Sequence, residues 1–384
     1  MIDRKLAAWQ HAGLIDAQAA AAIRAYEEEH ARPLALWAVV GIGALAIGLG
    51  LISVVAANWH AIPGLLRLAV HFALIGALAG LLWQRGEALI IERPWAHEAL
   101  LFVLAILGLT FFGHLGQVYQ TSAPLWQPMA LWLALFGPVL LLRGNSWLTA
   151  LLLAGVLVFT CWDFANPTRP LFGFEAGERS RLVMGLASAL PVLLVPLGSW
   201  RLELSARPAF WRRLEQLAFL YVLFCASLLV VASGIGEFDG AGDGRFLSFG
   251  TQAAQAGVGF VAAALTFAAR RGPSEVGTAI VLASAAIALL LAHAVDGSGL
   301  AAALLFMALW VAIGLASVHG GWRDVFQLAV GAVAVRLVIL SFELASDLLT
   351  SGFGLIVAGL LILGVAWAAV HVSRRLAPPG EAAA

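Results

Sequence analysis

Long apolar stretches recur along the chain and are separated by short polar segments. Crossing a hydrocarbon core of about 30 Å takes about 20 residues at 1.5 Å per residue of α-helix. Stretches of that size predict an all-α fold, a polytopic helical membrane bundle with about twelve transmembrane helices and no fewer than ten. We place the spans near residues 34–56, 67–83, 98–118, 128–142, 147–163, 182–199, 214–235, 251–269, 276–295, 300–318, 325–345 and 351–372.

Residues 1–33 are polar, with nine formal charges, and precede the first apolar stretch. They predict a cytoplasmic helical hairpin, with a stop at Gly13 and an N-cap at Asp16, because a short acceptor side chain satisfies free amides of a first helical turn. A hairpin of this size is too small to fold robustly alone, so we expect it to contact the membrane domain, a membrane partner or a second copy of the chain. The candidate contact residues are apolar: Trp9, Leu14, Ile15 and Ile23.

The rest of the chain divides into a transmembrane domain, residues 34–373, and a short cytoplasmic tail, residues 374–384, which is expected to be disordered. The first apolar stretch lacks the short basic start and the cleavage site of a signal peptide, so we interpret it as a retained span.

Composition agrees with a membrane protein, since 62% of residues are hydrophobic and 11% are charged, against about a quarter charged in soluble domains. The 22 Lys and Arg residues balance the 22 Asp and Glu residues, so no net field favours nucleic acid. Cys161 and Cys225 show none of the spacing of a disulfide framework or zinc site. The lipid bilayer is the expected partner.

Positive charges favour one orientation, because cytoplasmic loops of membrane proteins are rich in Lys and Arg. Alternate segments on the side of the N-terminus hold sixteen of them, the opposite segments hold five, and Arg336 lies within a span. Both termini are therefore predicted to be cytoplasmic. The loop 164–181 is the weakest part of this map, and the fourth and fifth spans, separated only by residues 143–146, are the place where a miscount would most easily arise.

Arg336 and Glu343 are ionisable residues within the otherwise apolar eleventh span. A charge at bilayer depth costs at least about 2.5–3.5 kcal/mol on insertion scales, so each should face protein or water and have a partner. They share one helical face but lie two turns apart, about 10 Å along the axis, and we expect each to have a partner on another helix. The functional interpretation is a substrate- or proton-linked pair lining a cavity. The structural alternative is a buried ion pair or a glutamate that snorkels to the interface.

Other polar residues fall at the outer ends of the predicted spans. Together with Glu343 they predict an outward-facing polar vestibule, although snorkelling and helix capping produce similar patterns. The candidates for a substrate or vestibule site, beyond Arg336 and Glu343, are Asn58, Trp59, Gln117, Tyr119 and His293. Histidines in this layer, which include His71 and His114, do not share a helix at metal-ligand spacing, so no metal site is predicted. Prolines at 191 and 196 predict a broken or kinked sixth span.

The pattern Leu6-x-x-Trp9-x-x-x-Gly13-Leu14-Ile15, followed by an Asp-capped helix, resembles a bacterial family of predicted membrane proteins, domain of unknown function 2157. The likeness continues through Asn58-Trp59 and residues 116–120, and covers about residues 1–165. The C-terminal end, from Arg336 through Glu343 to Arg374-Arg375, resembles the end of related proteins. The resemblance implies location in the bacterial inner membrane and carries no established activity.

Three classes of function remain after these observations. The favoured one is small-solute transport or ligand sensing through the outward vestibule. The alternative is a non-catalytic membrane scaffold or assembly protein whose buried polar residues are structural. An enzyme is less favoured because no nucleophile and base can be paired, and no cofactor is predicted because Walker, dinucleotide and zincin motifs are absent from the sequence.

Overall fold

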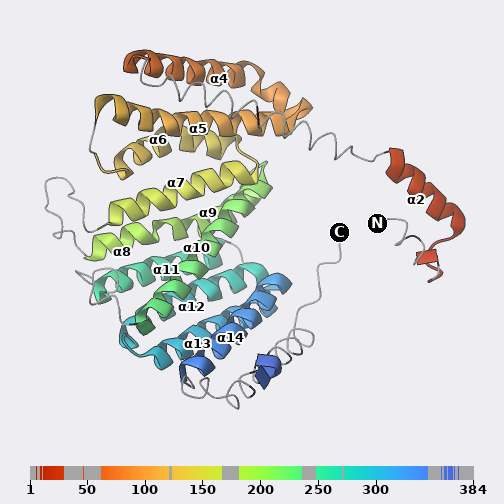
Figure 1. Ribbon diagram of the computed structural model, residues 1–384, viewed down its shortest axis with the longest axis vertical. Coiled ribbons are helices and arrows are strands. Elements are labelled where there is room, and N and C mark those ends of the chain that lie inside the picture. Colours follow the sequence, from red (N-terminus) through yellow and green to blue (C-terminus); the bar gives the residue numbers. More distant parts are fainter. Residues whose placement is uncertain are drawn as a thin grey trace. The chain divides into compact units, whose positions relative to one another are not determined.

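The computed structural model describes residues 6, 9–10, 12–29, 46, 62–120, 123–166, 181–235, 248–269 and 272–344, and a few residues between 356 and 371. These residues form helices joined by short turns, with no β-strand in the described part of the chain (Figure 1). They fall into two compact units, Met1–Ala69 and Val70–Ala384. The predicted all-α fold is confirmed.

The N-terminal unit contains the predicted second helix, α2, at Ala17–Glu29. Asp16 caps it as expected, because its Oδ1 accepts a hydrogen bond from the amide of Ala19 at 2.6 Å. Gly13 has φ +69°, a left-handed conformation that glycine adopts without steric cost. Of the candidate contact residues, Ile15 and Ile23 are half-buried, whereas Trp9 and Leu14 are 42% and 72% exposed. A partner for this surface stays a prediction.

Ten described helices are long and apolar enough to cross a membrane. They correspond to the ten predicted spans from the second to the eleventh, which confirms a multi-pass membrane protein. The predicted spans 34–56 and 351–372 lie almost entirely outside the described residues. The helices are α4 (Gly64–Glu92), α5 (Pro94–Tyr119), α6 (Trp126–Arg143), α7 (Trp147–Ala165), α8 (Arg181–Ala189) continued by α9 (Leu194–Leu204), α10 (Pro208–Ile235), α11 (Phe249–Ala269), α12 (Pro273–Ala294), α13 (Gly299–Gly320) and α14 (Arg323–Leu344).

The turn at residues 143–146 separates two complete helices. From the sequence, this turn was the place where the number of spans is most easily miscounted. Ser146 begins α7 with a capping box: its hydroxyl accepts from the Thr149 amide at 3.2 Å, and the Thr149 hydroxyl accepts from the Ser146 amide at 3.3 Å. These contacts satisfy amides that have no partner within the helix. The fourth and fifth spans are therefore distinct helices.

Prolines break the sixth span as the sequence predicts. Helix α8 ends at Ala189, a 3₁₀ turn covers Leu190–Leu193, and α9 begins at Leu194. Pro191 stands at the start of the 3₁₀ turn, where its missing amide hydrogen breaks the α-helical ladder. Pro138, in contrast, is accommodated inside α6.

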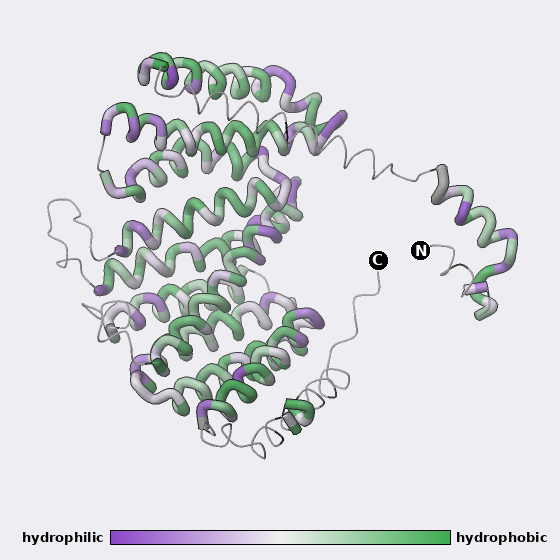
Figure 2. Tube along the Cα trace, in the orientation of Figure 1, coloured by the Kyte–Doolittle hydropathy of each residue, from purple (hydrophilic) through white to green (hydrophobic). Residues whose placement is uncertain are grey.

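Helices α5 to α14 pack largely as neighbours in chain order, and α10 contacts α7, α9, α12 and α13 (Figure 1). Two apolar clusters form the interior, and α10 contributes to both: Phe210, Trp211 and Leu214 to the cluster of α5–α7, and Val222 and Val230 to the cluster of α9–α14. Apolar residues follow the helices, and hydrophilic residues gather toward their ends (Figure 2). Large apolar side chains such as Leu315, 69% exposed, also face outward, as expected for helices in contact with lipid.

Candidate functional site

Arg336 and Glu343 contact each other directly. The Nη1 of Arg336 donates to Oε1 of Glu343 at 2.8 Å, and Nη2 donates to Oε2 at 3.3 Å. The expectation that the two residues are too far apart along the helix to contact each other is therefore wrong, whereas a partner on another helix stays a prediction. It counted only the axial rise between the two backbone positions, and two long side chains that lean toward each other along one face bridge that distance.

The ion pair lines an elongated cavity of about 1000 Å³ between α10, α13 and α14. Gln327 and Glu343 mark its limits along α14, about 24 Å apart at 1.5 Å per residue. Gln327 and Glu343 are polar, Arg336 lies between them on the same wall, and the other side chains that line the cavity are apolar. The lining residues of the wall include Val231, Ile235, Leu300, Phe306, Trp310, Leu328, Val335, Ile339 and Leu340.

The two charged groups differ in exposure, which is 12% for the side chain of Arg336 and 45% for that of Glu343. The Nε of Arg336 is buried and has no hydrogen-bond partner among the described residues. A guanidinium carries five N–H donors, and two are used by Glu343. Arg336 is thus a mostly buried cation with N–H donors that Glu343 does not use, and Glu343 is its more exposed counter-ion.

The remaining vestibule candidates do not gather around this cavity. Gln117 and Tyr119 are exposed at the end of α5, which packs against α6 and α7. His293 is exposed at the end of α12, which packs against α10, α11 and α13, and its ring lies 5.9 Å from that of Phe249. Asn58 and Trp59 lie outside the described residues. Only Arg336 and Glu343, of the candidates that the structure describes, line one cavity.

Two histidines of the same predicted layer do meet. The Nδ1 atoms of His71 on α4 and His114 on α5 lie 2.8 Å apart, and Nε2 of His71 contacts the carbonyl of Leu107 at 2.9 Å. Because a carbonyl only accepts, Nε2 of His71 is the donor in its contact with Leu107, and one of the two Nδ1 atoms donates to the other. No three His, Cys, Asp or Glu side chains in the described ranges gather in a way that suits a metal ion.

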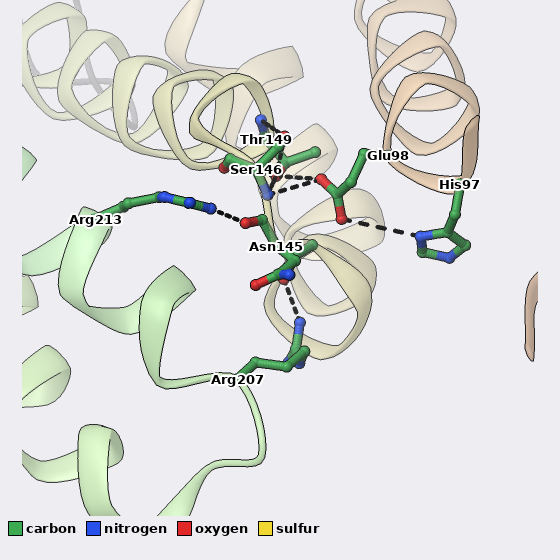
Figure 3. A network of polar contacts seen from close by, with 8 residues as sticks. His97, Glu98, Asn145, Ser146, Thr149, Arg207 and Arg213 are labelled. Atoms are coloured by element: carbon green, nitrogen blue, oxygen red, sulfur yellow. Dashed lines mark hydrogen bonds and ion pairs between the residues drawn. The ribbon is translucent and has the colours of Figure 1, made fainter. Parts of the chain in front are cut away.

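A polar network joins the beginnings of α5, α7 and α10 and the end of α6 (Figure 3). Glu98, near the start of α5, accepts from the amide of Ser146 at 2.9 Å and from the hydroxyl of Thr149 at 3.1 Å. His97 lies beside it, with Nδ1 at 3.9 Å from the carboxylate. Glu98 thereby fixes the beginning of α7 to the beginning of α5.

Two arginines from the start of α10 complete this network. Arg207 donates to the carbonyls of Leu141 and Gly144, which end α6, and Arg213 donates to the carbonyl of Asn145 (Figure 3). Cations at a helix C-terminus also complement the helix dipole. Burial lowers the pKa of the Arg207 guanidinium, and the nearby charge of Glu98 offsets part of that effect.

Sequence reasoning did not identify this network. Its one local signal was Glu98, a carboxylate at the first residue of a predicted span and therefore close to the membrane boundary. The partners of Glu98 lie 48 and 51 residues further along the chain, and only the packing of α5 beside α7 brings them together.

A second buried polar cluster lies beside the break between α8 and α9. Tyr221 accepts from Nε1 of Trp162 at 2.9 Å and donates to the carbonyl of Ser188, while Nε2 of Gln255 donates to the hydroxyl of Ser188 at 3.0 Å. Gln252, one turn from Gln255 on α11, is fully buried, and neither polar atom of its amide has a hydrogen-bond partner among the described residues.

Comparison with known families gives a match in the N-terminal part of the chain only. Residues 7–149 match the family of predicted membrane proteins DUF2157. Neither the curated proteins nor the solved structures contain a match. The DUF2157 match includes α2, α4, α5, α6 and the start of α7, and hence Glu98, Ser146 and Thr149. The cavity along α14 lies outside it, so the predicted C-terminal resemblance stays a prediction.

Proposed function

We propose that this multi-pass membrane protein binds a ligand in the cavity along α14 and works in transport or sensing of that ligand. The observation that carries the proposal is the Arg336–Glu343 pair on the wall of a cavity of about 1000 Å³. That volume is at the upper end of the range for small-molecule sites, and an apolar wall with few polar groups is typical of them.

The alternative, a scaffold whose charged residues are structural, is less well supported by this pair. A structural ion pair in a helical bundle stabilises packing when it joins two helices, whereas Arg336 and Glu343 both belong to α14. Charges at membrane depth are costly and usually mark pathways or sites. We also place the protein in a bacterial inner membrane with both termini cytoplasmic, a proposal that rests on the charge bias of the loops and on the resemblance described above.

Accessibility of the cavity tests the proposal. In a chain with Cys161 and Cys225 replaced by serine, Ile339→Cys puts one thiol on the cavity wall, at a side chain that is 43% exposed, one turn from both charges. Ile287→Cys on α12 is the matched control, because Ile287 is 48% exposed, lies at a similar distance from its helix end, and does not line the cavity. The variants are reconstituted in vesicles and treated with a water-soluble maleimide that reaches both faces of the membrane.

We expect the thiol at 339 to react rapidly, because polar groups hold water at that end of the cavity, and the thiol at 287 to be protected in lipid. Equal protection of both thiols, with labelling only after denaturation, sinks the proposal and favours a sealed structural pair.

A further inference from the structure

We propose that the cavity along α14 binds a zwitterionic phospholipid with a primary ammonium headgroup, such as phosphatidylethanolamine. This inference rests on the proposed function, since it names the class of ligand. The phosphate is assigned to Arg336, the ammonium to Glu343, and one acyl chain to the apolar part of the cavity.

The charge balance of the site selects for a zwitterion. Arg336 and Glu343 together are neutral, and each is the other's ion-pair partner. An anion that bound Arg336 alone would leave Glu343 without a counter-ion, and a cation that bound Glu343 alone would leave Arg336 without one. A zwitterion supplies both counter-ions at once, so both protein charges stay paired in a low-dielectric setting.

The hydrogen-bonding groups fit the two halves of the headgroup. A guanidinium is a planar fork that matches phosphate oxygens, and a carboxylate accepts from an ammonium group. The side chain of Arg336 is 12% exposed and that of Glu343 is 45% exposed, so Glu343 is the group that moves when a headgroup enters between them.

The shape of the cavity fits an acyl chain. Between Arg336 and Gln327 the cavity extends about 14 Å along α14, and its wall there is formed by apolar residues that include Phe306 and Trp310. At Gly331 a Cβ atom would meet nothing within 4 Å, so this stretch of the wall is open space rather than packed interior. Burial of an acyl chain against such a wall is favoured by the hydrophobic effect.

Trp310 provides an internal reporter, because it lines the cavity and is only 7% exposed. The full chain is reconstituted in unbrominated phosphatidylcholine vesicles that contain a variable minor fraction of one lipid with brominated acyl chains. Bromine quenches nearby tryptophan fluorescence, and subtracting the Trp310→Phe variant isolates the contribution of Trp310. The three brominated lipids carry ethanolamine, choline or glycerol headgroups, which are respectively a zwitterion with N–H donors, a zwitterion without them, and an anion.

We expect brominated phosphatidylethanolamine to quench Trp310 at about a tenfold lower mole fraction than the other two lipids, the difference that loss of charge-assisted hydrogen bonds produces. The double variant Arg336→Gln, Glu343→Gln keeps the site neutral and similar in shape, and it should quench equally with all three lipids. A Ser341→Ala variant, on the same helix but not on the cavity wall, should behave as the wild type.

Three results overturn the inference: equal quenching by the three lipids in the wild type, strongest quenching by the anionic lipid, or no quenching of Trp310 by any of them. Each is distinguishable from failure of the proposed function, because labelling of the thiol at 339 reports separately whether the cavity is open.

Discussion

Glu98→Ala is the sharpest test of the network that joins α5, α6, α7 and α10. The side chain of Glu98 is 15% exposed, and its carboxylate accepts two hydrogen bonds, from the Ser146 amide and the Thr149 hydroxyl. Hydrogen bonds to charged groups contribute about 1.5–3 kcal/mol each. Because the two share one oxygen and the site is partly solvated, we expect a loss of about 2–4 kcal/mol in the free energy of unfolding.

The free energy is measured by steric trapping in bicelles, with binding of a reporter to doubly tagged protein as the readout. Glu98→Gln keeps an oxygen that accepts neutral hydrogen bonds and should retain roughly half of the stabilisation. Glu87→Ala is the matched control, since Glu87 also pairs with an arginine, Arg143, but is 78% exposed; exposed pairs contribute about 1 kcal/mol or less. Equal losses for Glu98→Ala and Glu87→Ala would refute the assignment of Glu98 as the residue that anchors the α6–α7 turn.

Three further substitutions test other parts of the structure by the same measurement. Gly185→Ala should destabilise the protein by about 1–3 kcal/mol, because its Cβ would lie 2.3 Å from the carbonyl oxygen of Thr251. The control Gly80→Ala, where a Cβ meets nothing within 4 Å, should be neutral or slightly stabilising. The reverse order of stability would contradict the close approach of α8 and α11. Gln252→Met should stabilise by about 1–3 kcal/mol because it removes a buried amide that has no hydrogen-bond partner among the described residues, and destabilisation would mean that the amide is hydrogen-bonded after all. Arg207→Lys should cost about 1–3 kcal/mol because one ammonium cannot reproduce the planar fork that contacts two carbonyls, and a neutral result would show that the α6 C-terminus is held by other contacts.

Hydropathy predicted the existence of the ten described membrane helices because apolar length is a property of the local sequence. It placed some ends poorly. The second span was expected to end at residue 83, but α4 continues to Glu92, since a helix does not stop where the hydrocarbon stops. Turn chemistry was more informative at Pro191, where the missing amide hydrogen breaks the helix as predicted. The capping box at Ser146 was not predicted, although its two residues lie within one turn of each other.

The candidate site was predicted less completely, for reasons that differ between residues. Arg336 and Glu343 were found because charges inside an apolar run stand out, but their contact depends on side-chain conformation, which helical spacing does not determine. Glu98 was missed because its partners are set by which helices become neighbours. The gathering of span-end residues such as Gln117 and His293 was an assumption about packing, and α5 and α12 pack against different helices.

The two groups of charged residues differ in what satisfies them, and this difference underlies the different roles that we propose for them. Glu98 and Arg207 contact backbone groups of other helices, so each contact offsets the cost of desolvation by fixing one helix against another. Arg336 and Glu343 satisfy each other within α14 and face a cavity. Their contact lies within α14 and joins no two helices, so it does not fix α14 against α13, the helix that it packs on. The ligand site that we propose would account for them, and the ligand hypothesis therefore rests on the pair on α14 rather than on the network of Glu98 and Arg207.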